Sequence, residues 1–308
     1  MRNDKEESVE SLAEDIASNI IRKGGIGEFL RSYQLSLNHF ISSTPPIDIL
    51  PSRTVPLTDT SLILAHNAYN SLSSGSIMPN QALNLTELLD IGVRGIELDV
   101  HWDNGDARLC HEICNKIPIL SYNRLLSDAL NEINNWLMKN PSEVLIIKFE
   151  DYLGSAPVST LENIVRSTLN TTSIFTPADL GAVGRNWPSI DNISGMGKQI
   201  ILMPQNTMSS ALMFHSDWGG KFKNSFSTGT IAKVRPSYAI PRRYPTELFE
   251  VGEDKTFLGR IGSYSRGIIP VGGEMTKEDI QSLRTNGVTI ISLDHIESKD
   301  SRLTGALR

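Results

Sequence analysis

The stretch Val93–Trp102 most constrains the fold, because it has the pattern of a buried β-strand that carries two acidic side chains. Apolar residues in this stretch alternate with Glu97 and Asp99. Successive side chains of a strand point to opposite faces, so both acids project from the same side. Buried carboxylates are costly unless a cation or a proton neutralises them. The pattern therefore indicates a candidate metal site on one face of a buried strand.

Segments with the patterns of strands and helices alternate along the chain, which predicts a parallel sheet. At this length we expect an α/β fold of the TIM type, which is a closed (β/α)8 barrel, either in its regular form or with irregular strands and helices. Residues 204–245 are poorly patterned and predict long loops. The predicted strands span 61–67, 93–102, 107–112, 143–151, 198–203 and 288–296, and the predicted helices span 84–92, 122–138, 158–169, 190–196 and 276–286.

The barrel is expected to occupy residues 57–308, preceded by an N-terminal extension over residues 1–56. Within that extension, residues 4–42 have helical spacing and residues 44–56 form a proline-rich linker. We expect the extension to pack on the main domain. A helix that lies on a membrane surface is the less favoured alternative, because the polar face is mainly acidic.

Composition bounds the class of protein. The 308 residues are 39% hydrophobic and 21% charged, as in soluble globular proteins. A net charge of −6 argues against a nucleic-acid partner, which would favour a basic surface. No apolar run approaches the ~20 residues of a membrane span, and the N-terminus lacks the apolar core of a signal peptide.

Two cysteines, Cys110 and Cys114, lie close together in the stretch RLCHEIC. Their spacing is compatible with a small disulfide loop, which would indicate an oxidising compartment, and equally with two free thiols. A zinc site is disfavoured, because two cysteines and a nearby histidine do not match the usual paired ligand spacings.

Polar residues gather at the C-terminal ends of the predicted strands, which form the functional face of an α/β barrel. Carboxylates and an amide without thiolates favour Ca²⁺, and less strongly Mg²⁺, as the bound ion. Two histidines beside such an ion suit acid–base catalysis near neutral pH. The residues at these strand ends are His66, Asn67, Glu97, Asp99, His111, Lys148, Glu150 and Asp294.

Each of these residues also has a purely structural interpretation. A single histidine at a strand end is more often a hydrogen-bonded structural residue than a catalyst. Glu97 and Asp99 could pair with arginines such as Arg94 or Arg108, and Lys148 could be a structural counter-ion for Glu150. The functional interpretation depends on the coincidence of so many polar residues at successive strand ends.

Four motifs, in order, resemble the X-domain of the phosphoinositide-specific phospholipases C. The resemblance lies in a His-Asn pair, a Glu-x-Asp strand, a second histidine and a later strand that bears a glutamate. It covers roughly residues 58–205 and extends to WPSID followed by GKQIILM. The four motifs are AHNAYNS, RGIELDVHW, LCHE and VLIIKFED.

The resemblance implies roles for these residues. His66 and His111 match the two catalytic histidines, and Lys148 matches a basic residue near the substrate. Asp294 is expected to orient a histidine. The positions that hold Ca²⁺ in the metal-dependent members are matched by Asn67, Glu97, Asp99 and Glu150.

The reaction that the resemblance implies is attack of the inositol 2-hydroxyl on the phosphodiester, giving diacylglycerol and a cyclic inositol phosphate. Glu97, Glu150 or His66 would accept the hydroxyl proton, and His111 would protonate the departing glycerol oxygen. Ca²⁺ would lower the pKa of the hydroxyl and neutralise developing charge. The protein would act as a monomer on phospholipid at a membrane surface.

Departures from the family narrow the expectation. The strand GKQIILMP lacks the lysines that hold ring phosphates in the signalling enzymes, with Leu202 and Pro204 at about their places. We therefore expect a preference for phosphatidylinositol, or a glycosylated form, over polyphosphorylated lipids. A lone X-domain resembles the secreted bacterial and fungal enzymes, so a secreted location is slightly favoured.

Three alternatives stay open from the sequence. Glycerophosphodiester phosphodiesterases and sphingomyelinase D-like lipases also use two histidines and a Glu-x-Asp pair. Asn67 directly after His66, and the long gap to Glu97, favour the phospholipase C resemblance over both. The third alternative is a non-catalytic lipid-binding barrel.

Overall fold

A computed structural model describes the central part of the chain and a few later segments. The predicted N-terminal extension and the predicted helix at 276–286 lie outside these residues. For the strands at 218–224 and 248–253 only the backbone is described. The described residues are 51–71, 73–74, 76, 80–81, 83–110, 114, 123–157, 159–184, 186–204, 213–215, 218–224, 248–253 and 290–293.

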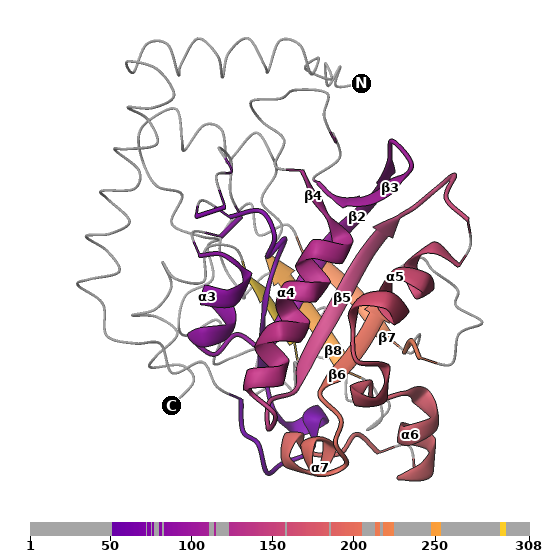
Figure 1. Cartoon of the computed structure of the whole chain (residues 1–308). Helices are drawn as coiled ribbons and strands as arrows, with labels where there is room; N and C mark the ends of the chain where they lie inside the picture. The colour runs from indigo at the N-terminus through magenta and orange to yellow at the C-terminus, as the bar shows by residue number, and fades with distance from the viewer. Residues whose placement is uncertain are drawn as a thin grey trace, which may run out of the picture.

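The described residues form a mixed sheet, and α3, α4 and α5 pack on one face of it (Figure 1). In chain order the elements are η1 (Leu57–Asp59), β1 (Leu62–Ala65), α3 (Leu85–Asp90), β2 (Gly95–Asp103), β3 (Asp106–Leu109), β4 (Arg124–Leu125), α4 (Leu126–Lys139), β5 (Leu145–Tyr152), α5 (Thr160–Thr168), η2 (Thr171–Ser173), α6 (Pro177–Ala182), α7 (Ile190–Gly195), β6 (Ile200–Pro204), β7 (Trp218–Asn224), β8 (Leu248–Glu253) and β9 (Ile290–Leu293).

Seven of the described strands run parallel, in the spatial order β6-β5-β2-β1-β9-β8-β7. A single parallel bridge, Leu202 to Phe214, places the residues just before β7 beside β6. The predicted alternation of parallel strands and helices is confirmed for this part of the chain. The pairings among the described residues form an open sheet, so they do not establish the closed eight-stranded barrel.

The prediction of a parallel sheet is wrong for β3 and β4, because β2 pairs antiparallel with β3, and β3 with β4. The physical reason is the two-residue turn between β2 and β3. Asn104 and Gly105 both have positive φ, at 52° and 85°. Asn-Gly tolerates this conformation and is a strong signal for a tight hairpin. The expected strand at 107–112 therefore returns along β2 and ends at Leu109.

The predicted long loops over 204–245 are also wrong in part, because β7 lies within them. Its sequence, WGGKFKN, has two glycines and no sustained apolar alternation, so it gave no strand signal. β7 pairs in parallel with β8, which also had no predicted counterpart.

Local signals predicted α3, α4, α5 and α7, but not α6, and α4 begins at Leu126 instead of at residue 122. Asn84 and Glu87 form the predicted capping box of α3, each side chain accepting from the other residue's backbone N–H, at 2.9 and 2.8 Å. The apolar face predicted for α4 is buried, which explains why this amphipathic helix packs on the sheet. Its six buried residues are Leu126, Ala129, Leu130, Ile133, Trp136 and Leu137.

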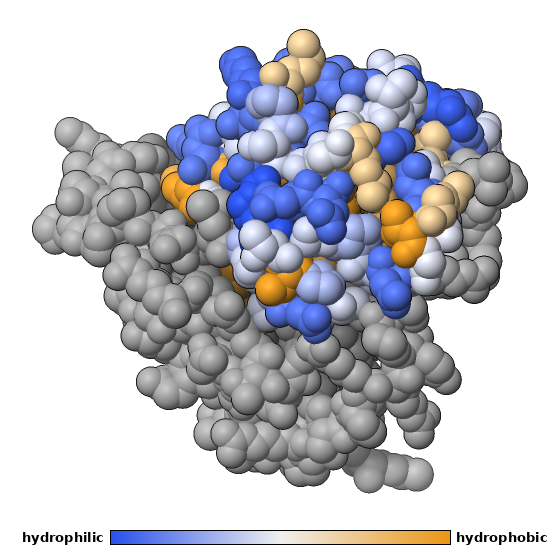
Figure 2. Space-filling model, turned by 90° about the horizontal axis from the view of Figure 1, so that it is seen from below, coloured by the Kyte–Doolittle hydropathy of each residue, from blue (hydrophilic) through white to orange (hydrophobic). Residues whose placement is uncertain are grey.

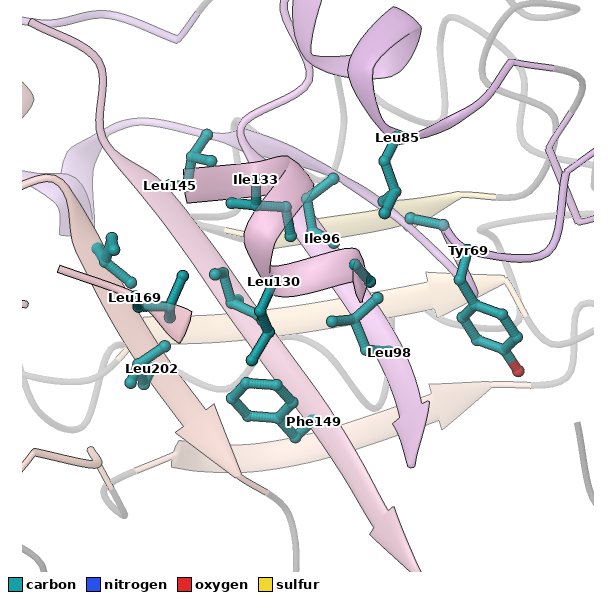
Figure 3. Packing of buried hydrophobic residues seen from close by; sticks show 14 of the residues in the cluster. Tyr69, Leu85, Ile96, Leu98, Leu130, Ile133, Leu145, Phe149, Leu169 and Leu202 are labelled. Carbon is teal, nitrogen blue, oxygen red and sulfur yellow. The ribbon is translucent and has the colours of Figure 1, made fainter. Parts of the chain in front are cut away.

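Two apolar clusters lie on opposite faces of the sheet. The larger one fills the space between α4 and the outward side chains of the strands, including Ile96, Leu98 and Phe149 (Figure 3). The smaller one lies on the other face, towards the strand N-termini, and includes Leu64, Ile146 and other residues. The candidate site lies on this second face as well, next to the smaller cluster and towards the strand C-termini. The smaller cluster thus forms an apolar base for the site.

One close contact between β1 and β2 requires a glycine in this second face. Gly95 pairs in register with Leu64, and a Cβ atom built on Gly95 would lie 2.7 Å from the Leu64 Cβ. Only a residue without a side chain lets the two strands approach this closely at that point.

Among the described residues, no helix is both long enough and apolar enough to cross a bilayer. The coloured part of the surface seen from below in Figure 2 is mostly hydrophilic, with small and separate hydrophobic patches. The described large hydrophobic residues that are exposed are Met138, Tyr152, Val183 and Met196.

Candidate functional site

The predicted acids come together because β2 and β5 lie side by side in register. Glu97 pairs with Lys148, and Asp99 pairs with Glu150. Their neighbours Leu98 and Phe149 point into the helix-covered cluster, so these four polar side chains occupy the opposite face. The period-two pattern of both strands is confirmed. Glu97 and Asp99 lie within β2 and not at its end, because β2 continues to Asp103.

Three carboxylates form a compact group on this face. Glu97, Asp99 and Glu150 each offer an oxygen, and these oxygens lie within 4.8 Å of one another. The residues are nearly inaccessible, with exposed fractions of 1%, 5% and 3%. Carboxylates buried this closely repel one another unless positive charge is brought between them.

Lys148 brings one positive charge to this group. Its ammonium lies 3.2 Å from Glu97 Oε2 and 3.5 Å from Glu150 Oε1, and the side chain is 2% exposed. The Ser292 hydroxyl on β9 also donates to Glu97 Oε2, at 3.4 Å. The ammonium thus brings positive charge directly to two of the three carboxylates.

The two arginines that could have neutralised the acids contact other residues instead. Arg94 pairs with Glu143, with 2.7 Å between Nε and Oε2, and donates to backbone carbonyls of Leu89 and Val93. Arg108 pairs with Asp106 on its own strand, at 3.4 Å. The structural interpretation that paired Glu97 and Asp99 with these arginines is therefore not supported.

His66 and Asn67 follow β1 directly, and the Asn67 side chain reaches this group. Asn67 has a positive φ of 45°, a conformation that asparagine adopts more readily than most residues. The following turn is tied to β2 by a hydrogen bond from the Ala68 N–H to the Glu97 carbonyl, at 3.0 Å. The turn thus brings the His-Asn pair to the acids on β2.

The Asn67 amide is directed at the Asp99 carboxylate. With its nitrogen on that side, it donates to both carboxylate oxygens, at 2.9 and 2.8 Å. Rotation of the amide by half a turn would place its oxygen there, which is favourable only around a shared cation. Carboxylate and amide oxygens of this kind are what Ca²⁺ prefers, so the four residues fit such an ion.

A buried polar network surrounds His66, and the sequence did not predict it. The Asn80 amide nitrogen lies 3.4 Å from His66 Nδ1, and Asn70 donates to the Asn80 amide oxygen at 2.6 Å. Gln81 donates to the carbonyls of His66 and Leu293, at 2.9 Å each. These loop residues have no periodic pattern, so only the path of the folded loop brings them to the histidine.

A second unpredicted pair lies one step further along the same face. His101 pairs in register with Tyr152, and their rings stack with centroids 5.0 Å apart and planes 26° apart. The Tyr152 hydroxyl donates to Glu150 Oε2, at 3.0 Å. Partial burial, followed by the nearby Glu150 carboxylate, raises the pKa of the Tyr152 phenol well above its usual range, so the phenol stays protonated. The alternation that identified the acids would have found both residues.

Two predicted site residues, His111 and Asp294, lie outside the described residues. The distance between the two proposed catalytic histidines is therefore a prediction that the structure does not test. Their immediate neighbours are described: Cys110 is bonded to Cys114 by a disulfide, and Leu293 ends β9. Of the two interpretations of the cysteines, the structure has the disulfide.

The position assigned to Leu202 is corrected by the register of β6. Met203 pairs with Lys148, and Ile201 with Ile146, so these two side chains share the face of the acids. Leu202 packs in the helix-covered cluster instead. The inward residues of β6 are therefore apolar, as the prediction about missing lysines requires.

The sequence matches the model of the PI-PLC X family over residues 56–226, which is more than half of the chain. The chain belongs to the PI-PLC X family. The matched region contains the Glu97, Asp99 and Glu150 group and the His66-Asn67 turn, so the family assignment and the geometry concern the same part of the chain.

Relatives in this family are similar over different lengths. An uncharacterized protein of Mycobacterium tuberculosis is 28% identical over 286 residues, which cover 82% of this chain and 57% of that protein. The chain thus spans little more than half the length of this relative. A PI-PLC X domain-containing protein of Arthroderma benhamiae is 31% identical over 139 residues, 44% of this chain and 43% of that protein. A protein described as secreted, from the same fungus, is 27% identical over 142 residues, 46% of this chain and 30% of that protein.

Solved structures show the fold that this PI-PLC X chain shares. The phosphatidylinositol-specific phospholipase C from Listeria monocytogenes is similar with a TM-score of 0.52 and 16% identity, over 87% of this chain and 96% of that one. A Staphylococcus aureus enzyme of the same description has a TM-score of 0.52 and 10% identity, over 87% and 97%. At such identities the similarity concerns the fold alone.

Proposed function

We propose that this protein is a calcium-dependent phosphodiesterase of the phospholipase C type that cleaves phosphatidylinositol or a glycosylated form of it. The observation that carries the proposal is the buried group of Glu97, Asp99 and Glu150 beside the His66-Asn67 turn, in a member of the PI-PLC X family. The products would be diacylglycerol and a cyclic inositol phosphate, released by a monomer at a membrane surface.

Glu97, Asp99, Glu150 and the Asn67 amide oxygen would hold the cation. When bound, Ca²⁺ supplies a positive charge that makes the attacking hydroxyl more acidic and offsets negative charge on the phosphoryl oxygens. The apolar base formed by residues such as Leu64 and Ile146 keeps water away from one side of the group. Fewer waters on that side strengthen each electrostatic interaction within the group.

The side chains of this protein would carry the proton transfers. Glu97 or Glu150 lies within reach of a substrate hydroxyl at the acid group, and His66 lies beside Asn67 at the same edge. His66 would donate a hydrogen bond to a phosphoryl oxygen or accept the hydroxyl proton. His111 would donate the proton to the departing glycerol oxygen, a role that rests on the family resemblance.

Substrate choice would follow from the inner face of β6. Ile201 and Met203 carry no charge to bind phosphates on the inositol ring. We therefore propose that lipids with an unphosphorylated ring are cleaved faster than polyphosphorylated ones.

We also propose that the parallel strands close into a barrel of the TIM type. The strand order ends at β6 on one side and β7 on the other, and the Leu202–Phe214 bridge lies between them. An experimental structure in which β6 and β7 remain far apart would contradict this closure.

The disulfide and one relative support an extracellular location. Disulfides persist in oxidising compartments, and Cys110 and Cys114 form a disulfide. A fungal relative is described as secreted. We therefore propose that the protein acts outside the reducing cytosol.

The test is an assay of phosphatidylinositol vesicles with added Ca²⁺ and with EGTA. The proposal expects diacylglycerol and a cyclic inositol phosphate with Ca²⁺, and no turnover with EGTA. Full activity in EGTA would remove the calcium requirement. Release of choline or glycerol phosphate from other lipids, with phosphatidylinositol intact, would instead identify a different phosphodiesterase, and binding without cleavage would identify a lipid-binding protein.

A further inference from the structure

The inner face of β2 and β5 continues beyond the acids to an aromatic pair. Side chains at Glu97, Asp99 and His101 share one face of β2, and those at Lys148, Glu150 and Tyr152 share the matching face of β5. The pair His101–Tyr152 is thus the third row of this face. Tyr152 is 45% exposed, so this row lies at the solvent side of the buried acids.

The two oxygens of Glu150 are contacted by different donors from the same strand. The Tyr152 hydroxyl donates to Oε2 at 3.0 Å, and the Lys148 ammonium lies 3.5 Å from Oε1. The Tyr152 hydrogen bond limits rotation of this carboxylate about its terminal bond, and the more distant ammonium adds an ionic contact at the other oxygen. The hydrogen bond thus favours one orientation of a carboxylate that has an oxygen within 4.8 Å of the oxygens of Glu97 and Asp99.

His101 restrains the tyrosine in turn. Its ring stacks on the Tyr152 ring, with a centroid distance of 5.0 Å. An exposed tyrosine without such a neighbour would lose its hydrogen bond in part of the population, because its side chain could rotate into solvent. The stack therefore favours the rotamer in which the hydroxyl reaches Glu150.

We propose that Tyr152 is a positioning residue that holds Glu150 as a cation ligand, and that His101 keeps Tyr152 in place. The inference rests on the proposed function in one respect, that Glu150 binds a cation. Hydrogen bonds to metal-bound carboxylates orient them, and their loss typically weakens metal binding by ~10–100-fold. Removing the hydroxyl should therefore change cation affinity far more than folding.

The test is calcium titration of the full chain by calorimetry, without lipid. Tyr152→Phe keeps the ring and its stack but removes the hydrogen bond, so we expect Ca²⁺ binding to weaken by roughly tenfold or more. Thermal unfolding in EGTA should match that of the wild type, which a merely structural role would not explain. Unchanged calcium affinity in Tyr152→Phe would overturn the proposal.

A matched control removes a hydroxyl from another carboxylate. The Thr86 hydroxyl donates to Glu132 Oε1 at 2.7 Å, on α3 and α4 away from the acids. Thr86→Val should leave calcium affinity unchanged. If it weakened binding as much as Tyr152→Phe, the effect would be a general loss of packing and the proposal would fail.

The histidine is tested by a conservative rescue. His101→Ala removes the stacking ring and should weaken calcium binding, whereas His101→Phe keeps a flat ring and should restore it. Unchanged affinity in His101→Ala, or equal loss in both variants, would remove the role of His101.

The outcomes separate this inference from the proposed function. Wild-type protein that binds Ca²⁺ but does not cleave phosphatidylinositol would refute the proposed reaction and leave the positioning role standing. Calcium-dependent cleavage with full calcium affinity in Tyr152→Phe would refute the positioning role alone. A wild type that binds no Ca²⁺ would refute both.

Discussion

Lys148 carries a buried ammonium that contacts two acids of the site. The residue was expected near a substrate, and the structure places its Nζ 3.2 Å from Glu97 and 3.5 Å from Glu150. Both roles are compatible, because an ammonium that balances the acids can also approach a phosphoryl oxygen. Its first effect is on the free energy of unfolding.

Replacing this lysine should destabilise the protein when no calcium is present. Lys148→Met leaves buried carboxylates without the ammonium, and loss of one partner of such a pair costs about 3–5 kcal/mol. Lys198→Met is the control, because the pair of Lys198 with Asp179 is partly exposed and contributes ~0–1 kcal/mol. Urea unfolding in EGTA measures both, and equal losses would contradict the buried role of Lys148.

The two histidines should be essential for turnover but not for lipid binding. His66→Ala and His111→Ala are each expected to lower the rate of phosphatidylinositol cleavage by ~10² or more, as for the loss of an acid or base. Sedimentation with lipid vesicles should stay as in the wild type. Asn163→Ala, at an exposed position of α5, is the control and should keep the wild-type turnover. Unchanged turnover in a histidine variant would show that the replaced histidine has no catalytic role.

Residues of the site were predictable where a strand fixes their direction. The period of two placed Glu97, Asp99, Lys148 and Glu150 correctly, because a strand leaves only two faces. Residues such as Asn80 were not predictable, because they reach His66 through an irregular loop whose path no local pattern encodes. The capping box of α3 and the apolar face of α4 were also predictable, because each follows from the spacing of residues close together in the sequence.

At the scale of elements, the contact between β1 and β2 depends on Gly95. Gly95→Ala would place a Cβ 2.7 Å from the Leu64 Cβ and 2.8 Å from its Cα, so the backbones must separate. We expect a loss of about 1–3 kcal/mol in the free energy of unfolding. Gly181→Ala is the control, since no atom lies within 4 Å of the added Cβ in α6 and alanine favours a helix. Equal stabilities of the two variants in denaturant titration would contradict this contact.

The N-terminus of α6 should make stability depend on acid pH. Burial raises the pKa of Asp179, but hydrogen bonds from Thr176 and the Lys198 ammonium outweigh burial and hold the pKa below its ordinary value of 3.8. A lowered pKa in the folded state means that the carboxylate stabilises the protein above the unfolded pKa, and that this contribution disappears as the pH falls through the folded pKa.

Asp179→Asn should therefore be less stable than the wild type at pH 7, by a few tenths to about 1 kcal/mol for a charge at a helix N-terminus. Below the pKa of Asp179 the difference in thermal unfolding should shrink towards zero. A difference that stays constant from pH 7 to strongly acid conditions would show that the charge is not its cause.

At the scale of the whole molecule, the strand order was harder to predict than the strands. Alternating elements implied parallel pairing, and seven described strands pair in that way. The turn at Asn104-Gly105 reverses the chain, so β3 runs antiparallel to β2. The glycine-rich β7 has no apolar pattern, and it is a strand because it pairs with a distant segment of the chain. Closure depends on pairings between segments far apart in the chain, which no local pattern specifies.

Calcium should stabilise the folded molecule by mass action. A ligand that binds only the folded state at a hundred times its Kd adds about 2.7 kcal/mol to the free energy of unfolding. Thermal unfolding with rising Ca²⁺ should therefore shift to higher temperature, and the shift should be lost in Glu97→Gln. The same shift in that variant would place the ion elsewhere.

The ammonium of Lys148 is a positive charge that is covalently part of the chain and lies among the buried acids. Because this charge is part of the chain, some of the repulsion among the buried acids is relieved before any divalent ion binds. If calcium is the cofactor, we expect the calcium-free chain to fold with a lower free energy of unfolding than the calcium-bound form.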